Sequence, residues 1–508
     1  MNLKITSLYL WIPIDQTAEE TKLEFYHNGK KVQELDAYLG KADCGFYTAW
    51  NAEKFLGEEL EIRSDTPEKQ LKYLFCWDEK PQNVYPFRPK LHFTPYLGWQ
   101  NDPNGLIYAN GLYHLYYQWN PYGVHWGNMH WGHAVSTDLI HWHPESVALE
   151  PDETGSAYSG CALQDFSNTA GFGKDALLFF YTAAGGRNKW SQEAGNRFTQ
   201  RLAYSTDGGR TLQKSDRILL DFLVTENRDP KVFYHPESQA YILILYLEGF
   251  EFALYRSNDL FHWEETQRLT VDGMWECPNL ERLPVEGTSE EKWVFWSADG
   301  YYQVGTFDGW HFQAETERKS AYFTKLRYAA QSFAGTPGRV VTMGWMRLKN
   351  TRGHYCGAMS LPTELSLVKN GDYQIRLWPA REVLALAGEP HPLATSAATL
   401  SPDGAPVMLD LEWSADASGI AAIRMGKVFA MADLDRNVLH LNEYKYAYDG
   451  SGGLNLKIII DQEIVELFGN DGTIYGAYEL GENVLGNEIQ TDLAGPCRKA
   501  TWCRLAVE

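Results

Sequence analysis

The sequence lacks an excess of basic residues and any long apolar run. Its 508 residues include 66 Asp and Glu against 45 Lys and Arg, so the formal net charge is −21. This charge argues against nucleic acid and anionic membrane surfaces as partners, because both need a basic footprint on the protein. The longest apolar runs, such as residues 176–184, have about half the length needed to span a bilayer. We therefore expect a soluble protein that binds neither nucleic acid nor a membrane.

A disulfide framework and a signal peptide are also missing. The cysteines are scattered, at positions 44, 76, 161, 277, 356, 497 and 503. An odd, dispersed set is unlike a disulfide framework, and the spacing of Cys497 and Cys503 is not that of a zinc site. The first apolar patch runs directly into Asp15 and Glu19, and no small-residue cleavage site follows it. We predict a reducing, cytoplasmic compartment, with a removed export signal as the alternative.

Three familiar site signatures are absent as well. Five histidines crowd residues 125–143, but they lack the helical His-Glu-x-x-His spacing of a zinc site. Glycine pairs such as residues 452–453 are not followed by the Lys-Ser or Lys-Thr of a phosphate-binding loop. Ser159 lacks the Gly-x-Ser-x-Gly turn of serine hydrolases. We expect no metal and no other cofactor.

Short aromatic and aliphatic runs dominate what is present. Aromatic residues make up 14% of the chain. The clearest runs, each bounded by turn residues, are 112–119, 240–247, 292–298 and 340–346. Such runs predict strands, whereas helical periodicity is confined to short segments such as 68–75 and 381–386. The pattern predicts an all-β protein, and some of the aromatic side chains are suited to stacking on sugar rings.

A weak internal repeat places a polar turn before an aromatic or apolar anchor. The turns contain Asp138, Asp207, Asp259 and Asp308, at intervals of 69, 52 and 49 residues. A period near 50 is typical of one four-stranded sheet per repeat, as in the blade of a β-propeller. We predict about five such units between residues 86 and 365.

The flanking segments differ from the repeat. Residues 1–85 form a strand-rich segment that ends in a proline-containing linker. The repeat stops after about residue 366, and residues 456–472 have the pattern of a β-hairpin of an antiparallel sandwich, with a second turn at 470–472. We predict an N-terminal accessory β domain at 1–85, a propeller domain at 86–365 and a C-terminal β-sandwich at 366–508.

Three carboxylates share a local context with proline. They are Asp102 in WQNDPNG (99–105), Asp229 in NRDP (227–230) and Glu276 in WECPN (275–279). The residue before a proline favours extended backbone, and proline suits a strand start. We therefore expect the acids at strand starts of successive repeats, where they can converge on a central channel. The alternative is that these motifs only form turns. The neighbours suited to binding sugar are Asn101, Arg228 and Trp275.

A pair of carboxyl groups suits cleavage of a glycosidic bond. The leaving oxygen needs a proton, and an oxocarbenium-like centre needs stabilisation. Carboxyl groups about 5 Å apart permit a covalent glycosyl-enzyme intermediate with retention, whereas inverting enzymes hold them about 6.5–9.5 Å apart. Glutamate is longer than aspartate, so it can reach the leaving oxygen as acid and then serve as base for water.

The same motifs resemble those of glycoside hydrolase family 32, the invertases, inulinases and levanases. The resemblance covers about residues 86–508. WQNDPNG is similar to the nucleophile motif of the family, NRDP to its Arg-Asp-Pro motif and WECP to its Glu-Cys motif. Further similar segments are YSG (158–160), WGNMHWGHA (126–134), GAMSLP (357–362) and ELFGNDG (466–472).

The resemblance implies a five-bladed β-propeller with a C-terminal β-sandwich, to which a small N-terminal β module is added. It also implies Asp102 as nucleophile, Glu276 as acid/base and Asp229 as a transition-state stabiliser that holds fructose hydroxyls. The implied substrate-binding residues are Asn101, Gln118, Trp126, Tyr158, Ser159, Arg228, Cys277 and Trp345. Cys277 is expected beside the acid/base, where it tunes that group.

The implied activity is that of a retaining, exo-acting β-fructofuranosidase on fructo-oligosaccharides, levan- or inulin-type fructans or sucrose. Two departures bear on the substrate: KLRYAA (325–330) lacks the acidic residue that many members carry before Tyr-Ala, and Asn279 stands where Asp often follows Glu-Cys-Pro. The N-terminal segment resembles a module of levanase-like members, which favours fructans over phosphorylated sucrose.

Four alternatives to this activity remain open. They are a fructosyltransferase that uses the same residues, a sucrose-6-phosphate hydrolase, an inverting arabinan glycosidase of the same shape and a non-catalytic carbohydrate-binding propeller. The presence of all three acids argues against the last of these. We expect a small-molecule or oligosaccharide substrate and a monomer or homodimer.

Overall fold

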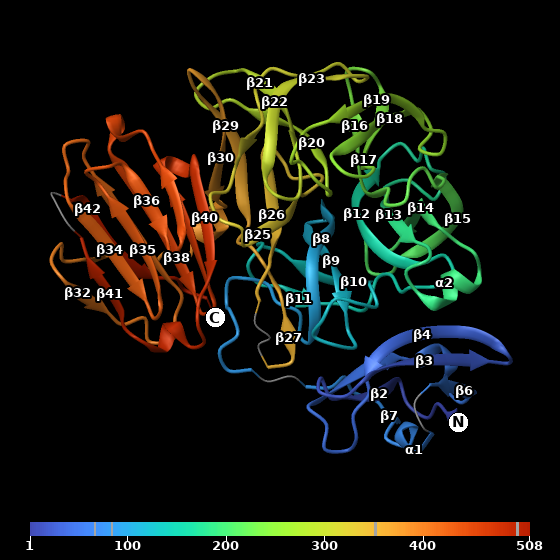
Figure 1. Ribbon diagram of the computed structural model, residues 1–508. Coiled ribbons are helices and arrows are strands. Elements are labelled where there is room, and N and C mark those ends of the chain that lie inside the picture. The colour runs from blue at the N-terminus through green and yellow to red at the C-terminus, as the bar shows by residue number, and fades with distance from the viewer. Residues whose placement is uncertain (66–67, 83–84, 350–352, 494–496, 508) are drawn as a thin grey trace.

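The chain is built almost entirely from strands, as the computed structural model in Figure 1 shows. The structure describes residues 1–507 apart from 66–67, 83–84, 350–352 and 494–496. Within this part of the chain, the α-helices are α1 (Glu68–Leu71), α2 (Lys189–Glu193) and α3 (Arg381–Leu384). None of these described helices has the length and apolar character to cross a membrane. The prediction of an all-β protein is confirmed.

The strongest apolar runs of the sequence form inner strands of the sheets. These are β9 (Leu112–Asn120), β17 (Ala240–Tyr246), β21 (Glu291–Trp296) and β26 (Val340–Met346). Every residue of β17 is buried, because neighbouring sheets cover both of its faces. Burial on both faces explains why such strands have continuous rather than alternating apolar sequences.

Five sheets, antiparallel apart from one short parallel pair, follow one another between residues 98 and 379. The first contains β8 (Gly98–Ala109), β9, β10 (His130–Ser136) and β11 (His143–Pro144), joined by β27 (Tyr355–Cys356). The second contains β12 (Ser156–Asp165), β13 (Ala176–Ala184), β14 (Phe198–Ser205) and β15 (Gln213–Leu220). The third contains β16 (Arg228–His235), β17, β18 (Glu251–Ser257) and β19 (Glu264–Thr270).

The last two sheets of this region have additional short strands. The fourth contains β20 (Asn279–Pro284), β21, β22 (Tyr301–Phe307) and β23 (Phe312–Ala314), with β24 (Lys319–Ser320) beside β22. The fifth contains β25 (Arg327–Ser332), β26, β29 (Thr363–Asn370) and β30 (Asp372–Pro379), with β28 (Ala358–Met359) beside β26. The first strands of the sheets are neighbours: β8 contacts β12 and β25, and β12 contacts β16.

The repeated Asp turns join the third and fourth strands of the first four sheets. In each turn the aspartate accepts hydrogen bonds of 2.7–3.1 Å from two backbone N–H groups that lie two to four residues later. These turns are Asp138, Asp207, Asp259 and Asp308. The repeat in the sequence therefore reflects a repeated piece of structure.

Residues 1–85 form two small sheets around their own core. One contains β1 (Asn2–Lys4), β6 (Glu59–Ser64), β3 (Glu20–His27) and β4 (Lys30–Tyr38). The other contains β5 (Phe46–Asn51), β2 (Tyr9–Ile14) and β7 (Phe75–Trp77). Leu10, Phe25 and Trp50 are buried between them, together with Tyr122 and Val124 from the next part of the chain. The two parts thus share one hydrophobic core.

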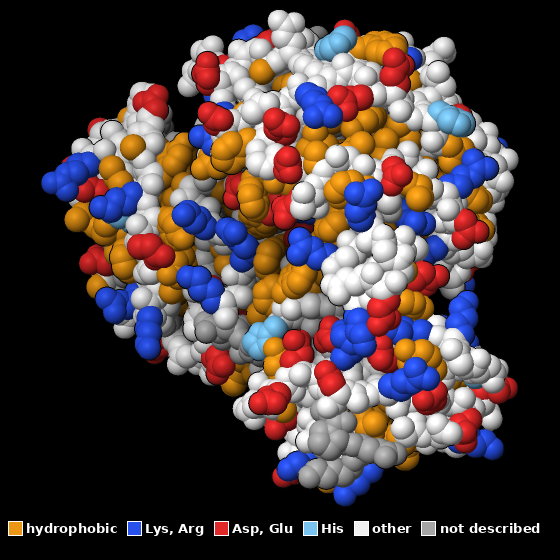
Figure 2. All heavy atoms as spheres, turned by 45° about the vertical axis from the view of Figure 1, so that its right-hand side comes forward, with side chains coloured by type: hydrophobic (Ala, Val, Ile, Leu, Met, Phe, Trp, Pro, Cys, Tyr) orange, Lys and Arg blue, Asp and Glu red, His pale blue; other side chains and the backbone are white. Residues whose placement is uncertain are grey.

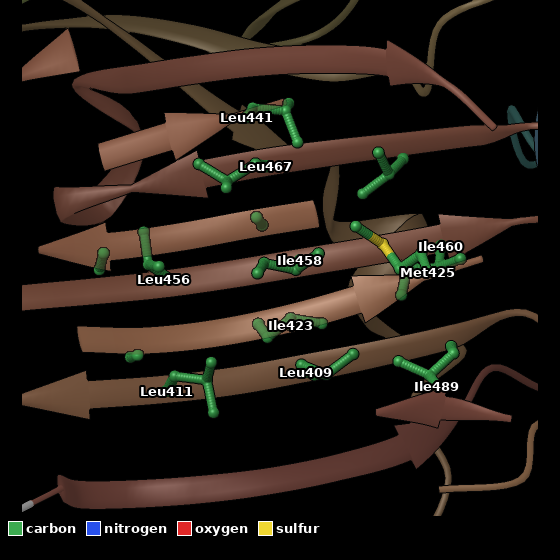
Figure 3. Close-up of a cluster of buried hydrophobic side chains, with 14 of the residues drawn as sticks. Leu409, Leu411, Ile423, Met425, Leu441, Leu456, Ile458, Ile460, Leu467 and Ile489 are labelled. Carbon is green, nitrogen blue, oxygen red and sulfur yellow. The ribbon is translucent and has the colours of Figure 1, made fainter. Parts of the chain in front are cut away.

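The C-terminal part is a sandwich of two six-stranded sheets. The first sheet contains β31 (His391–Pro392), β42 (Cys497–Arg504), β33 (Val407–Trp413), β38 (Leu454–Asp461), β39 (Ile464–Gly469) and β40 (Ile474–Glu479). The second contains β32 (Ala398–Leu400), β41 (Ile489–Asp492), β34 (Ile420–Met425), β35 (Val428–Asp433), β36 (Val438–Leu441) and β37 (Tyr444–Ala447). Figure 3 shows side chains of both sheets, such as Ile458 and Ile423, meeting in the core between them. The predicted hairpin at 456–472 corresponds to β38 and β39.

Charge does not gather into a single basic or acidic area on the face shown in Figure 2. Acidic and basic side chains are interspersed over it, with apolar side chains between them. The large negative charge of the chain is therefore spread out rather than concentrated at one site on this face.

Candidate active site

A cavity of about 350 Å³ is lined by residues of the first strands of four of the five sheets and by residues near them. Its lining residues are Asn101, Asp102, Gln118, Trp126, Tyr158, Ser159, Arg187, Phe198, Glu226, Arg228, Asp229, Glu276, Tyr328 and Trp345. Strands β8, β12, β16 and β25 each contribute to it, and Glu276 lies just before β20. The three acids singled out in the sequence therefore meet in one cavity.

β-Bulges in the first strands direct side chains toward this cavity. The pairing shifts lie between Gln100 and Pro103 in β8, Tyr158 and Gly160 in β12, Arg228 and Lys231 in β16, and Tyr328 and Gln331 in β25. Each shift coincides with a cavity residue. A bulge adds a residue to one strand and re-aims its side chain, so the same device places Asp102, Ser159 and Asp229.

The backbone is left-handed at two of the acids. Asp229 has φ 63°, Glu276 has φ 41° and the next residue, Cys277, has φ 42°. The prediction of extended backbone before proline is wrong for Asp229, because the bulge in β16 imposes this conformation. Such a conformation costs about 1–3 kcal/mol at a non-glycine residue and persists only where the surrounding structure holds it.

The acids come from the first, third and fourth sheets rather than from successive ones. The second sheet contributes Tyr158 and Ser159 in β12 instead of an acid. The expectation that successive repeats each contribute an acid is therefore wrong. The repeats follow one another around the cavity in the order of the chain, but they contribute different chemical groups to it.

Cys277 lies behind the cavity and touches two of the acids. Its Sγ is 3.7 Å from Asp102 Oδ2 and 3.5 Å from Asp229 Oδ2. Its backbone N–H also donates to Asp229 Oδ2 at 3.1 Å. Ser159 Oγ donates to Asp102 Oδ2 at 2.7 Å. The two aspartates are thus held close together by small neighbouring groups.

Arg228 contacts the carboxylates of Glu276, Asp229 and Glu226. Its Nη2 donates to Glu276 Oε2 at 3.1 Å, and its Nε is 3.7 Å from Asp229 Oδ2. Its Nη1 donates to Glu226 Oε2 at 3.1 Å. Its guanidinium also lies 4.7 Å from the ring centroid of Tyr246. One cation therefore compensates three carboxylates and is itself held against an aromatic ring.

Glu276 is more open to solvent than Asp229. Its side chain is 21% exposed, against 5% for Asp229. Tyr328 OH donates to Glu276 Oε1 at 2.6 Å, and Trp275 Nε1 donates to the same oxygen. The carboxylate is therefore oriented by donors at both oxygens while it remains accessible from the cavity.

Burial and mutual repulsion raise the pKa values of both aspartates. Burial and the charge of Glu276 raise the pKa of Asp102 to about 6, although the hydrogen bond from Ser159 opposes the change. Burial raises the pKa of Asp229 to about 7; Arg228 opposes this, while Glu276 and Asp102 add to it. Carboxyl groups with raised pKa values that share a cavity are typical of catalytic sites.

The other residues singled out in the sequence surround these acids. Gln118 Nε2 donates to the carbonyl of Ala157 at 2.8 Å, and Asn101 Oδ1 accepts from Trp99 Nε1 at 3.0 Å. The ring centroids of Trp345 and Tyr328 lie 6.1 Å apart. The predicted binding residues line the cavity with two exceptions. Cys277 is 2% exposed and lies behind it, and Trp275 is outside the lining but donates to Glu276.

Trp126 stands at the outer edge of the cavity. It is 55% exposed, and its ring centroid lies 6.0 Å from that of Tyr158. An exposed indole beside a second aromatic ring offers an apolar surface on which a sugar ring can stack.

Four cavity residues were not predicted from the sequence. Tyr328 lies in the KLRYAA segment, whose Tyr-Ala pair was the available signal. Arg187 and Glu226 lie in connections between strands, and Phe198 begins β14. Their place in the cavity depends on packing between segments, which no local motif reports. Among the described residues, no group of three or more His, Cys, Asp or Glu side chains is arranged to hold a metal ion.

Comparison with known proteins agrees with this geometry. The family model for the N-terminal domain of glycosyl hydrolases family 32 matches residues 92–379. The chain is 32% identical over 452 residues to the levanase of Bacillus subtilis, a match that covers 76% of this chain and 65% of the levanase. It is 30% identical over 477 residues to an extracellular exo-inulinase of Aspergillus niger, covering 76% of this chain and 88% of that protein.

Solved structures are similar over most of the chain. The exo-inulinase from Aspergillus awamori superimposes with a TM-score of 0.74 at 26% identity, covering 85% of this chain and 100% of that one. The β-fructofuranosidase from Schwanniomyces occidentalis, in complex with fructosyl-erythritol, gives a TM-score of 0.71 at 24% identity and covers 84% and 98%. This second likeness concerns the fold.

Proposed function

The chain belongs to glycoside hydrolase family 32, and we propose that it is a retaining β-fructofuranosidase. It releases fructose from the ends of fructo-oligosaccharides, levan- or inulin-type fructans or sucrose. One observation carries this proposal: Asp102 in β8, Asp229 in β16 and Glu276 just before β20 converge on a single cavity. The levanase and exo-inulinase relatives support fructans as the substrate class.

Asp102 is the proposed nucleophile. Its carboxylate attacks the anomeric carbon of the fructosyl unit while the bond to the leaving oxygen breaks, which forms a covalent fructosyl-enzyme. Ser159 and Cys277 both contact Oδ2 of Asp102. They orient the carboxylate, and we assign Oδ1 as the attacking atom.

Glu276 is the proposed acid/base. It donates a proton to the leaving oxygen in the first step and accepts one from water in the second. Its greater exposure supports this role, because the group must meet both a leaving sugar and an incoming water. Tyr328 and Arg228 hold one carboxylate oxygen each and so keep Glu276 directed at the bond that breaks.

Asp229 is the proposed transition-state stabiliser. Together with Arg228 it holds fructose hydroxyls, and its negative charge favours the oxocarbenium-like centre. Asn101, Gln118, Tyr158, Ser159 and Trp345 complete the proposed fructose pocket. Cys277 acts from behind as a group that positions Asp102 and Asp229.

The five sheets between residues 98 and 379 are the proposed blades of a five-bladed propeller. The sequence placed the end of this unit at 365, but β29 pairs with β26 on one side and with β30 on the other. This pairing supports a boundary near residue 379, with the sandwich beginning after it. Residues 1–85 are the proposed N-terminal accessory module.

The experiment that tests the function is a substrate panel with the purified full chain. The panel contains sucrose, 1-kestose, inulin, levan and sucrose-6-phosphate, and free fructose is measured by chromatography. We expect fructose from inulin- or levan-type substrates and none from the Asp102→Asn variant. A product profile at high sucrose concentration separates hydrolysis from transfer, and no fructose from any of the substrates would refute the proposal.

A further inference from the structure

Two cavity residues lie on connections that no sheet pairing holds in place. Residues 121–129, between β9 and β10, carry Trp126, and residues 185–197, between β13 and β14, carry Arg187. We call these connections the rim segments. In Figure 1, β3 and β4 of the N-terminal part lie next to β10 and α2, where the rim segments are found.

The N-terminal part holds the first rim segment on both sides of Trp126. Thr48 Oγ1 donates to the carbonyl of Pro121 at 2.5 Å. The backbone N–H of Asp36 donates to Asn128 Oδ1 at 2.7 Å, and Asn128 Nδ2 donates to the carbonyl of Asp36 at 2.8 Å. Between these points, Tyr122 and Val124 are buried in the core of residues 1–85. Trp126 can therefore be exposed while its backbone is fixed.

Buried charges hold the second rim segment. Glu34 Oε1 accepts from the backbone N–H groups of Lys189 and Trp190 at 2.8 and 3.2 Å. Lys31 Nζ lies 2.9 Å from Glu34 Oε2 and 3.1 Å from Glu193 Oε2. Because Glu34 and Lys31 are both buried, these charge-assisted contacts are stronger than surface ion pairs.

A chain of contacts continues from the rim to the acid/base. Arg187 Nη2 is 3.6 Å from Glu226 Oε1, and Glu226 Oε2 accepts from Arg228. Arg228 in turn donates to Glu276. Arg187 also lies 5.6 Å from the ring centroid of Phe198. The outer residues of the cavity are thus held by residues 1–85 on one side and meet the catalytic centre on the other.

We propose that residues 1–85 are a positioning module that fixes Trp126 and Arg187 for oligofructosides of three or more units. The proposal rests on the function proposed above. An indole ring and a guanidinium group suit stacking on sugar rings and hydrogen bonding to hydroxyls. A small aryl fructoside needs only the inner pocket, whereas a longer chain extends to the rim. The module therefore determines the KM for oligofructosides more than the kcat for short substrates.

Point variants of the contacts test this proposal. Glu34→Gln removes the charge that holds the second rim segment, and Asn128→Ala removes the bonds to Asp36. Glu61→Gln is the matched control, because Glu61 pairs with Arg63 within the module. We expect the KM for 1-kestose to rise about five-fold in the two rim variants, with kcat on an aryl β-fructofuranoside unchanged. Unchanged KM values, or an equal loss on both substrates, would overturn the proposal.

Hydrogen exchange provides a second test that needs no substrate. We expect faster amide exchange in residues 121–129 for Asn128→Ala and in residues 185–197 for Glu34→Gln, and no change there for Glu61→Gln. Equal exchange in all variants would overturn the positioning role, while failure of the unaltered protein to release fructose would count only against the proposed function. If Glu34→Gln does not fold, Asn128→Ala still tests the proposal, and Thr48→Val repeats that test on the first rim segment at Pro121.

Discussion

At the scale of single residues, the cavity concentrates carboxylates that repel one another. Asp229 is buried and Asp102 is partly buried, Glu276 lies beside them, and Arg228 is a cation that contacts both Asp229 and Glu276. The motifs that carry the acids could be recognised from the sequence because proline and asparagine stand within three residues of each acid. The left-handed backbone at Asp229 could not, because it follows from how a bulged strand meets its neighbours.

Ser159 keeps the pKa of Asp102 lower than burial alone would place it. Ser159→Ala removes the hydrogen bond to Asp102 Oδ2, so the pKa of Asp102 should rise above about 6. Since only the ionised nucleophile attacks, activity is lost as the pH falls through this pKa. We expect the acid limb of the kcat/KM profile to move to higher pH in the variant. An unshifted acid limb would mean that another group controls it.

Burial and the charge of Glu276 make Asp102 a cost to stability near neutral pH. Its folded pKa of about 6 lies above the ordinary value of 3.8, so the folded state binds more protons between these values. Below pH 3.8 this group therefore does not destabilise the folded state. The free energy of unfolding falls as the pH rises from there through about 6. Asp102→Asn should raise the melting temperature at pH 7.5, and the gain should shrink at pH 4. An equal gain at both pH values would contradict this explanation.

At the scale of elements, the inner strands could be predicted and the bulges could not. Continuous apolar runs such as 340–346 indicate strands because burial on both faces leaves little room for polar residues. A bulge depends on the register between two strands, and neither strand alone records it. The Asp turns could be predicted in part. Each is a short local motif, and it became recognisable because it recurs with a period close to that of the sheets.

The Asp259 turn provides a test of the repeated element. Asp259 Oδ1 accepts from the N–H groups of Phe261 and His262 at 2.9 and 2.8 Å. Asp259→Ala should lower the free energy of unfolding by about 1 kcal/mol, a modest loss because the side chain is half exposed. Asp259→Asn keeps an acceptor oxygen and should lose less. Denaturant unfolding measures both, and equal losses would show that the turn depends on the charge rather than the hydrogen bonds.

At the scale of the whole molecule, a buried histidine joins the propeller region to the sandwich. His92 Nδ1 lies 2.9 Å from Asp461 Oδ2, and its Nε2 lies 2.9 Å from Glu466 Oε1. Asp461 also accepts from the backbone N–H groups of Lys90 and Leu91. The division into a repeat region and flanking domains was visible in the sequence. The junctions were not, because they join residues about 370 positions apart.

His92 should make the junction sensitive to high pH. Burial lowers its pKa, but the bonds to Asp461 and Glu466 outweigh this and raise it from 6.5 to about 9. Its contribution to stability is therefore fully present below pH 6.5 and is lost as the pH rises through about 9. His92→Gln should lower the free energy of unfolding by about 3–5 kcal/mol at pH 6 and by less at pH 10. A loss that does not depend on pH would contradict a charged His92.

The most direct test of the central claim is to trap the intermediate on the enzyme. Glu276→Ala removes the base that activates water, while an aryl β-fructofuranoside needs little help from an acid, so the fructosyl-enzyme should accumulate. Mass spectrometry of the digested protein should find one fructosyl group on the peptide that contains Asp102. Turnover of the aryl substrate with no adduct, or an adduct on a peptide without Asp102, would contradict the account.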